Sequence, residues 1–313
     1  MSTEPCRSEP AAQLALSGPT MGTRWSALAH AQHALDRHVL EHALAEACHR
    51  VDQQMSTWKP DSNLMRLNRM AVGAWMSIPD ELAYVLALGE GVRQRSGGLF
   101  DMAVLGAVQT AGFGPPARPE TPAGGERSTG PALEIDMGGL RARRLEPVAL
   151  DLSGIAKGFA VDLMARTMED FGVQDYLVSI DGEVQAGGFR GDGRPWAVAL
   201  EAPDADRRDI AARLEIHNAS LATSGSYRHR RLVGDRWISH TIDPRSGVPV
   251  ESDLVSVTVQ MPDCVLADAW ATALLVAGRQ RAEEMCRAEG LSAVLIAETG
   301  MGRELVGCGA FAR

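Results

Sequence analysis

The sequence lacks several features that would each assign it to a class of proteins. Its five cysteines are widely spaced and include no C-x-x-C pair, so we expect reduced, inert thiols rather than a zinc site, a redox dithiol or a disulfide-stapled mini-protein. No run of about eighteen apolar residues occurs, which argues against a membrane span. The polar start MSTEPCRSEP has neither the basic nor the apolar region of a signal peptide, and no lipoprotein anchor is visible, so we expect a cytoplasmic protein.

Charge and short motifs exclude further classes. The 40 acidic and 31 basic residues leave a net charge of −9, and a surface of this sign repels phosphate backbones. Nucleic acid is therefore not an expected partner. The motifs G-x-G-x-x-G after a strand and G-x-x-x-x-G-K-[ST] are both missing, so neither a Rossmann nor a P-loop nucleotide site is predicted.

What the sequence does contain is typical of one large domain or two packed lobes. Of its 313 residues, 45% are hydrophobic and 23% are charged, which is enough to bury a sizeable core. Apolar spacing predicts helices over residues 35–55, 80–94, 158–171, 265–277 and 281–289. Short apolar runs predict strands over 149–152, 176–180, 196–200, 254–260 and 291–296. Because no regular βαβ repeat is present, we predict an α+β fold with a mixed sheet and flanking helices, and an exposed proline- and glycine-rich loop over 114–131.

Two segments carry residue types suited to an anion and to a metal ion. In DLSGIAKG, residues 151–158, a predicted strand leads into a helix, so Lys157 and the backbone amides of the helix N-terminus can hold an anion. The alternative is a solvated lysine in an ordinary turn. Asp268 and Thr272 lie four residues apart on one helix face, and their hard oxygens suit Mg²⁺. An ordinary polar helix face gives the same spacing.

Two further segments allow a catalytic or a structural interpretation. His240 precedes the Asp243-Pro244 turn and can act as a general base near neutral pH. The pattern alone favours a histidine that caps a strand end through hydrogen bonds. The hydroxyl-rich run TSGSYR, residues 223–228, can hold phosphate or simply form a turn. None of these signals is specific by itself.

The order of these motifs along the chain is more specific than any one of them. They are MGT (21–23), STWKPDS (56–62), GLFD (98–101), DLSGIAKG (151–158) with Asp162 following, TSG (223–225), HTIDPRSGVP (240–249) and DAWAT (268–272). In this order they closely resemble the ApbE family over roughly residues 13–312, which we take as one domain after a flexible tail over 1–12. The resemblance implies a Mg²⁺-dependent FAD:protein FMN transferase. Such an enzyme splits FAD, joins FMN through a phosphoester to a Thr or Ser of an acceptor flavoprotein, and releases AMP.

The resemblance also implies a role for individual residues. Positions that match the family's metal ligands are Asp268 and Thr272, with the backbone carbonyl of Gly154 as a third oxygen. His240 matches a histidine implicated in transfer, and Lys157 would withdraw charge from the pyrophosphate. The positions that match the FAD contacts of the family are Met21, Trp58, Leu99, Phe100, Asp101, Asp151, Lys157 and Ile242.

The chain departs from the family pattern at two places. Where relatives often have a Gly-Gly pair after the central strand, this chain has Asp181-Gly182 followed by Glu183, which would alter acceptor or flavin preference. Ala271 stands where some relatives have a second carboxylate, which would weaken Mg²⁺ binding. Two other functions therefore stay open: an FAD pyrophosphatase that yields FMN and AMP, and an accessory protein that binds FAD without turnover.

Overall fold

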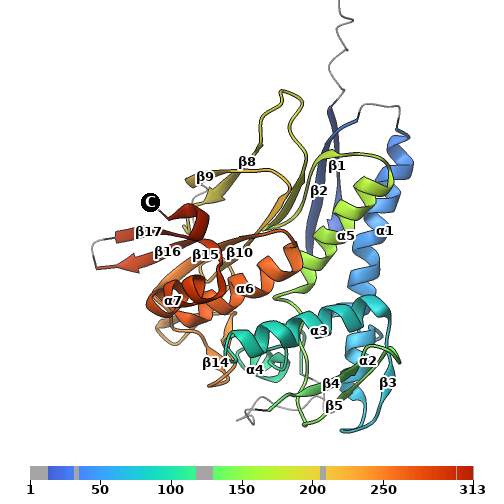
Figure 1. Ribbon diagram of the computed structural model, residues 1–313. Helices are drawn as coiled ribbons and strands as arrows, with labels where there is room; N and C mark the ends of the chain where they lie inside the picture. Colours follow the sequence, from blue (N-terminus) through green and yellow to red (C-terminus); the bar gives the residue numbers. More distant parts are fainter. Residues whose placement is uncertain (1–12, 32–34, 118–129, 205–208, 301, 313) are drawn as a thin grey trace, which may run out of the picture.

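Eight strands form the large antiparallel sheet of the computed structural model, in the order β1-β2-β6-β7-β10-β15-β16-β17 (Figure 1). Their bounds are Gln13–Thr20 (β1), Thr23–His30 (β2), Asp175–Ile180 (β6), Glu183–Gly187 (β7), Ala219–Gly225 (β10), Leu254–Met261 (β15), Ser292–Thr299 (β16) and Gly302–Cys308 (β17). The structure describes residues 13–31, 35–117, 130–204, 209–300 and 302–312. The tail predicted over 1–12 and most of the loop predicted over 114–131 lie outside these ranges.

Helices cover one face of the large sheet. Helix α5 packs on β6 and β7, α6 packs on β10 and β15, and the two helices contact each other. Helix α1 lies alongside α5, and α7 follows α6 directly (Figure 1). The bounds of these helices are Arg37–Met55 (α1), Ala156–Asp170 (α5), Cys264–Ala277 (α6) and Arg279–Glu289 (α7). Because alternate residues of a strand face opposite sides of its sheet, Val178 and Ile180 of β6 point into this helical core.

The opposite face of the sheet is covered by a hairpin of β8 (Trp196–Glu201) and β9 (Ile210–Ile216). Trp196 and Ile216 of the hairpin share a small buried cluster with Leu221 of β10, while Leu177 of β6 packs against that cluster. The sheet is therefore buried on both sides over β6, β7 and β10.

A smaller lobe lies beneath α5 and α6 in Figure 1. It contains α2 (Asn63–Arg69), α3 (Asp80–Arg95), α4 (Leu105–Thr110) and a three-stranded sheet of β3 (Met76–Ser77), β5 (Arg141–Arg144) and β4 (Leu133–Asp136). Helix α3 contacts α6, and the buried side chains of both lobes form one continuous cluster. The described chain is thus one domain with a shared core, and α6 is enclosed by the sheet on one side and by the lobe on another.

Two short hairpins and a 3₁₀ turn complete the described chain. Strands β11 (Arg230–Val233) and β12 (Arg236–Ser239) pair as a hairpin, and so do β13 (Ile242–Asp243) and β14 (Val248–Pro249). A 3₁₀ turn, Gly309–Phe311, follows β17. No helix within the described ranges is both long and apolar enough to cross a membrane.

The predicted α+β class is confirmed, and the strand pairs of the large sheet are antiparallel. The predicted helices are all present, with ends that differ from the prediction by at most two residues. The strand predicted over 149–152 is wrong, because this buried segment is extended loop. Its backbone groups bond elsewhere: the Asn68 side-chain amide both donates to and accepts from Leu150, at 2.9 and 2.8 Å. The Asn68 side chain of α2 thus makes the backbone hydrogen bonds that a neighbouring strand would otherwise make.

Candidate active site

A cavity of about 750 Å³ opens where the end of the large sheet meets the N-terminus of α5, the middle of α6 and the segment after α3. This volume is typical of sites for small molecules and cofactors. All predicted site residues except Trp58 line it, namely Met21, Leu99, Phe100, Asp101, Asp151, Gly154, Lys157, His240, Ile242, Asp268 and Thr272. Residues far apart in the sequence therefore converge on one cavity.

Trp58 is the predicted residue that the structure does not bring to the cavity. It follows α1 in a turn where the Ser56 hydroxyl accepts the Trp58 backbone N–H at 3.2 Å. The Ser62 hydroxyl donates to the Ser56 carbonyl at 2.7 Å and fixes the same turn. The Trp58 side chain is 66% exposed. Its role as an FAD contact stays a prediction that this placement does not support.

Lys157 stands in the first turn of α5 between two carboxylates. Its Nζ donates to Glu183 Oε2 at 2.8 Å and lies 3.7 Å from Asp181 Oδ2. Burial disfavours the charged ammonium, but the nearby carboxylates, first Glu183 and then Asp268, outweigh burial and raise the Lys157 pKa. Burial raises the Glu183 pKa, and Lys157 opposes that rise. The lysine is therefore a fixed positive charge at the cavity wall.

Asp268 of α6 connects this helix to α5 at the wall of the cavity. Its Oδ2 accepts the Gly158 backbone N–H at 3.0 Å, and the side chain is almost fully buried. Burial raises the Asp268 pKa, while Lys157 and the Gly158 N–H oppose that rise. A side chain at Gly158 would place its Cβ 2.4 Å from the Cys264 carbonyl oxygen, so only glycine lets α5 and α6 approach this closely.

Thr272 lies one turn after Asp268 on α6 and faces Gly154. A Cβ at Gly154 would lie 3.0 Å from Thr272 Oγ1, which shows how closely this loop approaches the hydroxyl. The Ser224 hydroxyl of β10 is 3.1 Å from Thr272 Oγ1. Asp268, Thr272 and the Gly154 backbone thus place hard oxygens at one end of the cavity. We call these three residues and Lys157 the buried end.

His240 lines the cavity from the segment between β12 and β13. Its Nδ1 is 3.1 Å from the His229 carbonyl oxygen, and its ring meets the His229 ring edge-on with centroids 5.3 Å apart. Burial, followed by the neighbouring His229, lowers the His240 pKa to about 4. The imidazole is therefore neutral at pH 7. If Nδ1 donates to the His229 carbonyl, which the geometry favours, Nε2 keeps its lone pair.

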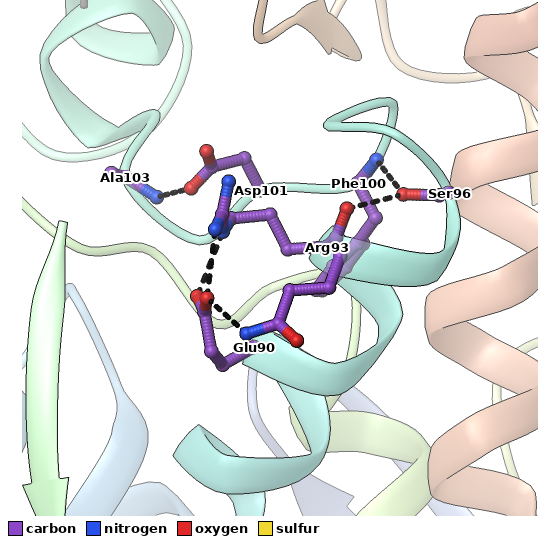
Figure 2. A network of polar contacts seen from close by, with 7 residues as sticks. Glu90, Arg93, Ser96, Phe100, Asp101 and Ala103 are labelled. Carbon is purple, nitrogen blue, oxygen red and sulfur yellow. Dashed lines mark hydrogen bonds and ion pairs between the residues drawn. The ribbon is translucent and has the colours of Figure 1, made fainter. Parts of the chain in front are cut away.

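A polar network at the C-terminal end of α3 fixes the segment that carries Leu99, Phe100 and Asp101 (Figure 2). The Ser96 hydroxyl donates to the Arg93 carbonyl and accepts the Phe100 backbone N–H at 3.1 Å. Asp101 Oδ1 accepts the Ala103 backbone N–H at 2.8 Å, which closes the next turn. Glu90 accepts two hydrogen bonds from the Arg93 guanidinium, each 2.8 Å long. The network holds Phe100 against the cavity with its ring almost fully buried.

Sequence reasoning named Asp162 and Glu183 but did not predict that either of them holds the site together. Asp162 on α5 accepts the backbone N–H groups of Cys264 and Val265 at 2.7 and 2.9 Å, so it caps the helix that carries Asp268. An acidic residue within the apolar repeat of α5 was the available signal. Glu183 was visible only as a departure from the family pattern, and no local pattern indicates its bond to Lys157.

Comparison with known proteins tests the resemblance noted from the motifs. The profile of the ApbE family matches residues 21–295. The chain belongs to the ApbE family. The FAD:protein FMN transferase of Salmonella typhimurium is 35% identical over 309 residues, which cover 96% of this chain and 88% of that protein. Family membership confirms the resemblance that the ordered motifs indicated.

Solved ApbE structures confirm the fold of this family member. The flavin transferase ApbE from Vibrio cholerae superposes with a TM-score of 0.85 at 32% identity, covering 96% of this chain and 99% of that one. The apo form of the Pseudomonas stutzeri flavinyl transferase ApbE gives a TM-score of 0.83 at 30% identity, covering 96% and 95%. The single α+β domain predicted from the sequence is therefore the ApbE fold.

Proposed function

We propose that this ApbE family member is an FAD:protein FMN transferase that uses Mg²⁺. It moves FMN from FAD to a Thr or Ser hydroxyl of an acceptor flavoprotein through a phosphoester bond and releases AMP. The name of the Salmonella typhimurium relative supports this function for a chain that matches it over nearly its whole length. The observation that carries the proposal is the convergence of distant motif residues on one cavity.

The buried end fits a divalent cation by the chemistry of its donors. Mg²⁺ prefers hard oxygens and keeps part of its shell for water and phosphate, and this end offers the Asp268 carboxylate, the Thr272 hydroxyl and the Gly154 carbonyl. A cation there would offset the burial that raises the Asp268 pKa. When bound, Mg²⁺ would neutralise charge on the pyrophosphate of FAD.

Lys157 and the phosphates of FAD are complementary in charge. The carboxylates around Lys157 keep it protonated, so it can attract the pyrophosphate at the start of α5, where helix amides also favour anions. The phosphate then competes with Glu183 and Asp181 for the ammonium. Lys157 orients the FMN-side phosphorus and stabilises the charge that develops as AMP leaves.

His240 supplies the base for the acceptor hydroxyl. Its neutral Nε2 takes the hydroxyl proton as the hydroxyl oxygen bonds to the FMN-side phosphorus, and the bond from this phosphorus to the AMP oxygen breaks. The low pKa of His240 keeps the ring unprotonated at neutral pH. The hydrogen bond at Nδ1 holds the ring in one orientation.

The test is a transfer assay with and without acceptor. Purified protein is incubated with FAD, Mg²⁺ and an extract of the organism that encodes it; denatured proteins are examined for flavin fluorescence and the solution for AMP. The proposal expects a fluorescent acceptor band with a modified Thr or Ser and stoichiometric AMP. AMP and free FMN without a labelled band would indicate an FAD pyrophosphatase. Bound, intact FAD without AMP would indicate an accessory FAD-binding protein.

A further inference from the structure

The hairpin of β11 and β12 exposes an apolar and cationic face that the transfer chemistry does not use. Leu232 is 52% and Trp237 is 58% exposed, and the two are directly paired across the strands. Arg230, two residues before Leu232, lies on the same side, with its guanidinium 4.5 Å from the centre of the Trp237 ring. We call Arg230, Leu232 and Trp237 the hairpin face.

The other side of the hairpin turns toward the body of the protein. Arg231 and Ile238 are paired on that side, and Ile238 is half-buried. The Arg231 guanidinium lies against Gly112, just after α4, because a Cβ at that glycine would overlap it. The hairpin face therefore points away from the body, although all four residues of β11 are exposed.

The hairpin joins the wall of the cavity at both of its ends. The residues directly before and after it, His229 and His240, both line the cavity, and the His240 backbone N–H donates to the His229 carbonyl at 3.0 Å. A protein segment that brings a hydroxyl to His240 comes close to the end of β12, because His240 follows that strand directly. The hairpin face is thus continuous with the place where the acceptor has to enter.

Composition and charge indicate what kind of surface fits this face. Tryptophan and arginine are enriched among the residues that dominate protein–protein binding. Arg230 is the arginine on this face, because Arg231 lies on the opposite side of the hairpin and Arg236 pairs with Glu251 at 2.6 Å. The complementary partner presents apolar side chains flanked by carboxylates.

We propose that the hairpin face is the docking surface for the acceptor flavoprotein. The acceptor covers Leu232 and Trp237 with apolar side chains and places an acidic residue near Arg230 while its Thr or Ser hydroxyl reaches His240. This proposal rests on the proposed transferase function, because only a protein substrate needs such a surface. Small-molecule steps at the buried end do not involve it.

The test compares Leu232→Ser/Trp237→Ser with a matched control, Val39→Ser/Val72→Ser. The control removes two other exposed apolar side chains, at 53% and 48% exposure, that do not line the cavity. The substrate is the acceptor that the wild-type chain labels in the transfer assay, purified at full length. The hairpin variant should raise the KM for this acceptor at least about tenfold while the KM for FAD stays within about twofold of wild type. The control variant should change neither constant.

Arg230→Gln tests the charge of the partner. It should raise the KM for the acceptor about two- to fivefold at low salt and make that KM less dependent on NaCl, because a rim charge acts mainly through screened attraction. Equal thermal unfolding of all variants shows that the fold is retained, as expected for exposed side chains.

Three outcomes would overturn the docking proposal. The first is an unchanged acceptor KM in Leu232→Ser/Trp237→Ser when the wild type labels the acceptor, which leaves the transferase function standing. The second is a wild-type dimer in light scattering that the same variant converts to monomer, because a second copy then occupies the face. The third is wild-type protein that labels no acceptor, which contradicts the transferase function and the docking proposal together.

Discussion

The buried end of the cavity and its hairpin rim are built in opposite ways. At the buried end, Asp268 is 3% exposed and is fixed by a backbone hydrogen bond between two core helices. At the rim, Trp237 is 58% exposed, and its hairpin joins the cavity through His229 and His240. The buried end is thus part of the hydrophobic core, whereas the hairpin face is part of the surface.

This difference indicates how the fold divides recognition. Groups that must hold a phosphate and a cation in a fixed geometry gain from burial, because charge interactions strengthen where water is excluded. A surface that binds another protein needs exposed side chains and can change without disturbing the core. Substitutions at the buried end should therefore reduce activity and often stability, whereas substitutions at the rim should affect only acceptor recognition.

The largest effect should come from Asp268→Asn. The amide keeps the size of the side chain and can still accept the Gly158 N–H, but it removes the negative charge that would hold Mg²⁺. We expect AMP release to fall by on the order of 100-fold or more, as for loss of one strong electrostatic group in a transition state. Asp263→Asn is the matched control, since Asp263 is an exposed carboxylate at the start of the same helix. Full activity of Asp268→Asn would remove the metal assignment.

His240→Ala should slow transfer by on the order of 100-fold, the usual contribution of a general base. The pH dependence is a sharper check. Because the His240 pKa is lowered to about 4, its base form persists as pH falls from 8 to about 5, and the contribution of His240 to the rate should decline only near pH 4. The contrary result is a wild-type transfer rate that declines near the ordinary histidine pKa of about 6.5, with no such decline in His240→Ala. It would show that burial does not hold the ring neutral.

The sequence could predict the local parts of the site but not its long-range pairs. Asp268 and Thr272 share a helix face by spacing, and Lys157 stands at the start of a helix that its apolar repeat predicts, so a short stretch of sequence is enough to find both features. The bond from Asp162 to Cys264 joins residues 102 positions apart, and no local pattern contains it. The error over 149–152 has the same cause, because its apolar run fits a strand and only the fold reveals that Asn68 takes the place of one. Trp58 carries a family motif, yet its side chain faces solvent.

The two lysines of the chain allow a direct comparison of buried and exposed ion pairs. Lys157→Met should lower kcat/KM for FAD about 10- to 100-fold, the value of a charged hydrogen bond. It should also lower the free energy of unfolding by about 2 kcal/mol or more, because Glu183 is left buried and unpaired. Lys59→Met breaks the more exposed pair with Asp52 and should cost less than about 1 kcal/mol without changing kcat/KM.

A double variant separates charge pairing from packing at Lys157. Lys157→Met/Glu183→Gln should recover part of the lost stability, measured by urea unfolding, because the second change removes the unpaired carboxylate. Activity should stay low, since the ammonium is still missing. Equal stability of the single and double variants would show that Glu183 does not depend on Lys157 for its burial.

The smallest effect should come from Asp181→Gly, at the position where relatives often have glycine. Asp181 has φ +55°, a conformation that glycine adopts freely, so the backbone of the β6–β7 turn should be unchanged. Its carboxylate lies 3.7 Å from the Lys157 ammonium and is 47% exposed, so it competes only weakly with the phosphates of FAD. We expect the KM for FAD to fall about two- to fivefold, in keeping with the small free energy of exposed pairs. A rise in that KM would instead mean that Asp181 contacts the flavin directly, and a half-exposed side chain would then take part in binding FAD beside the buried end.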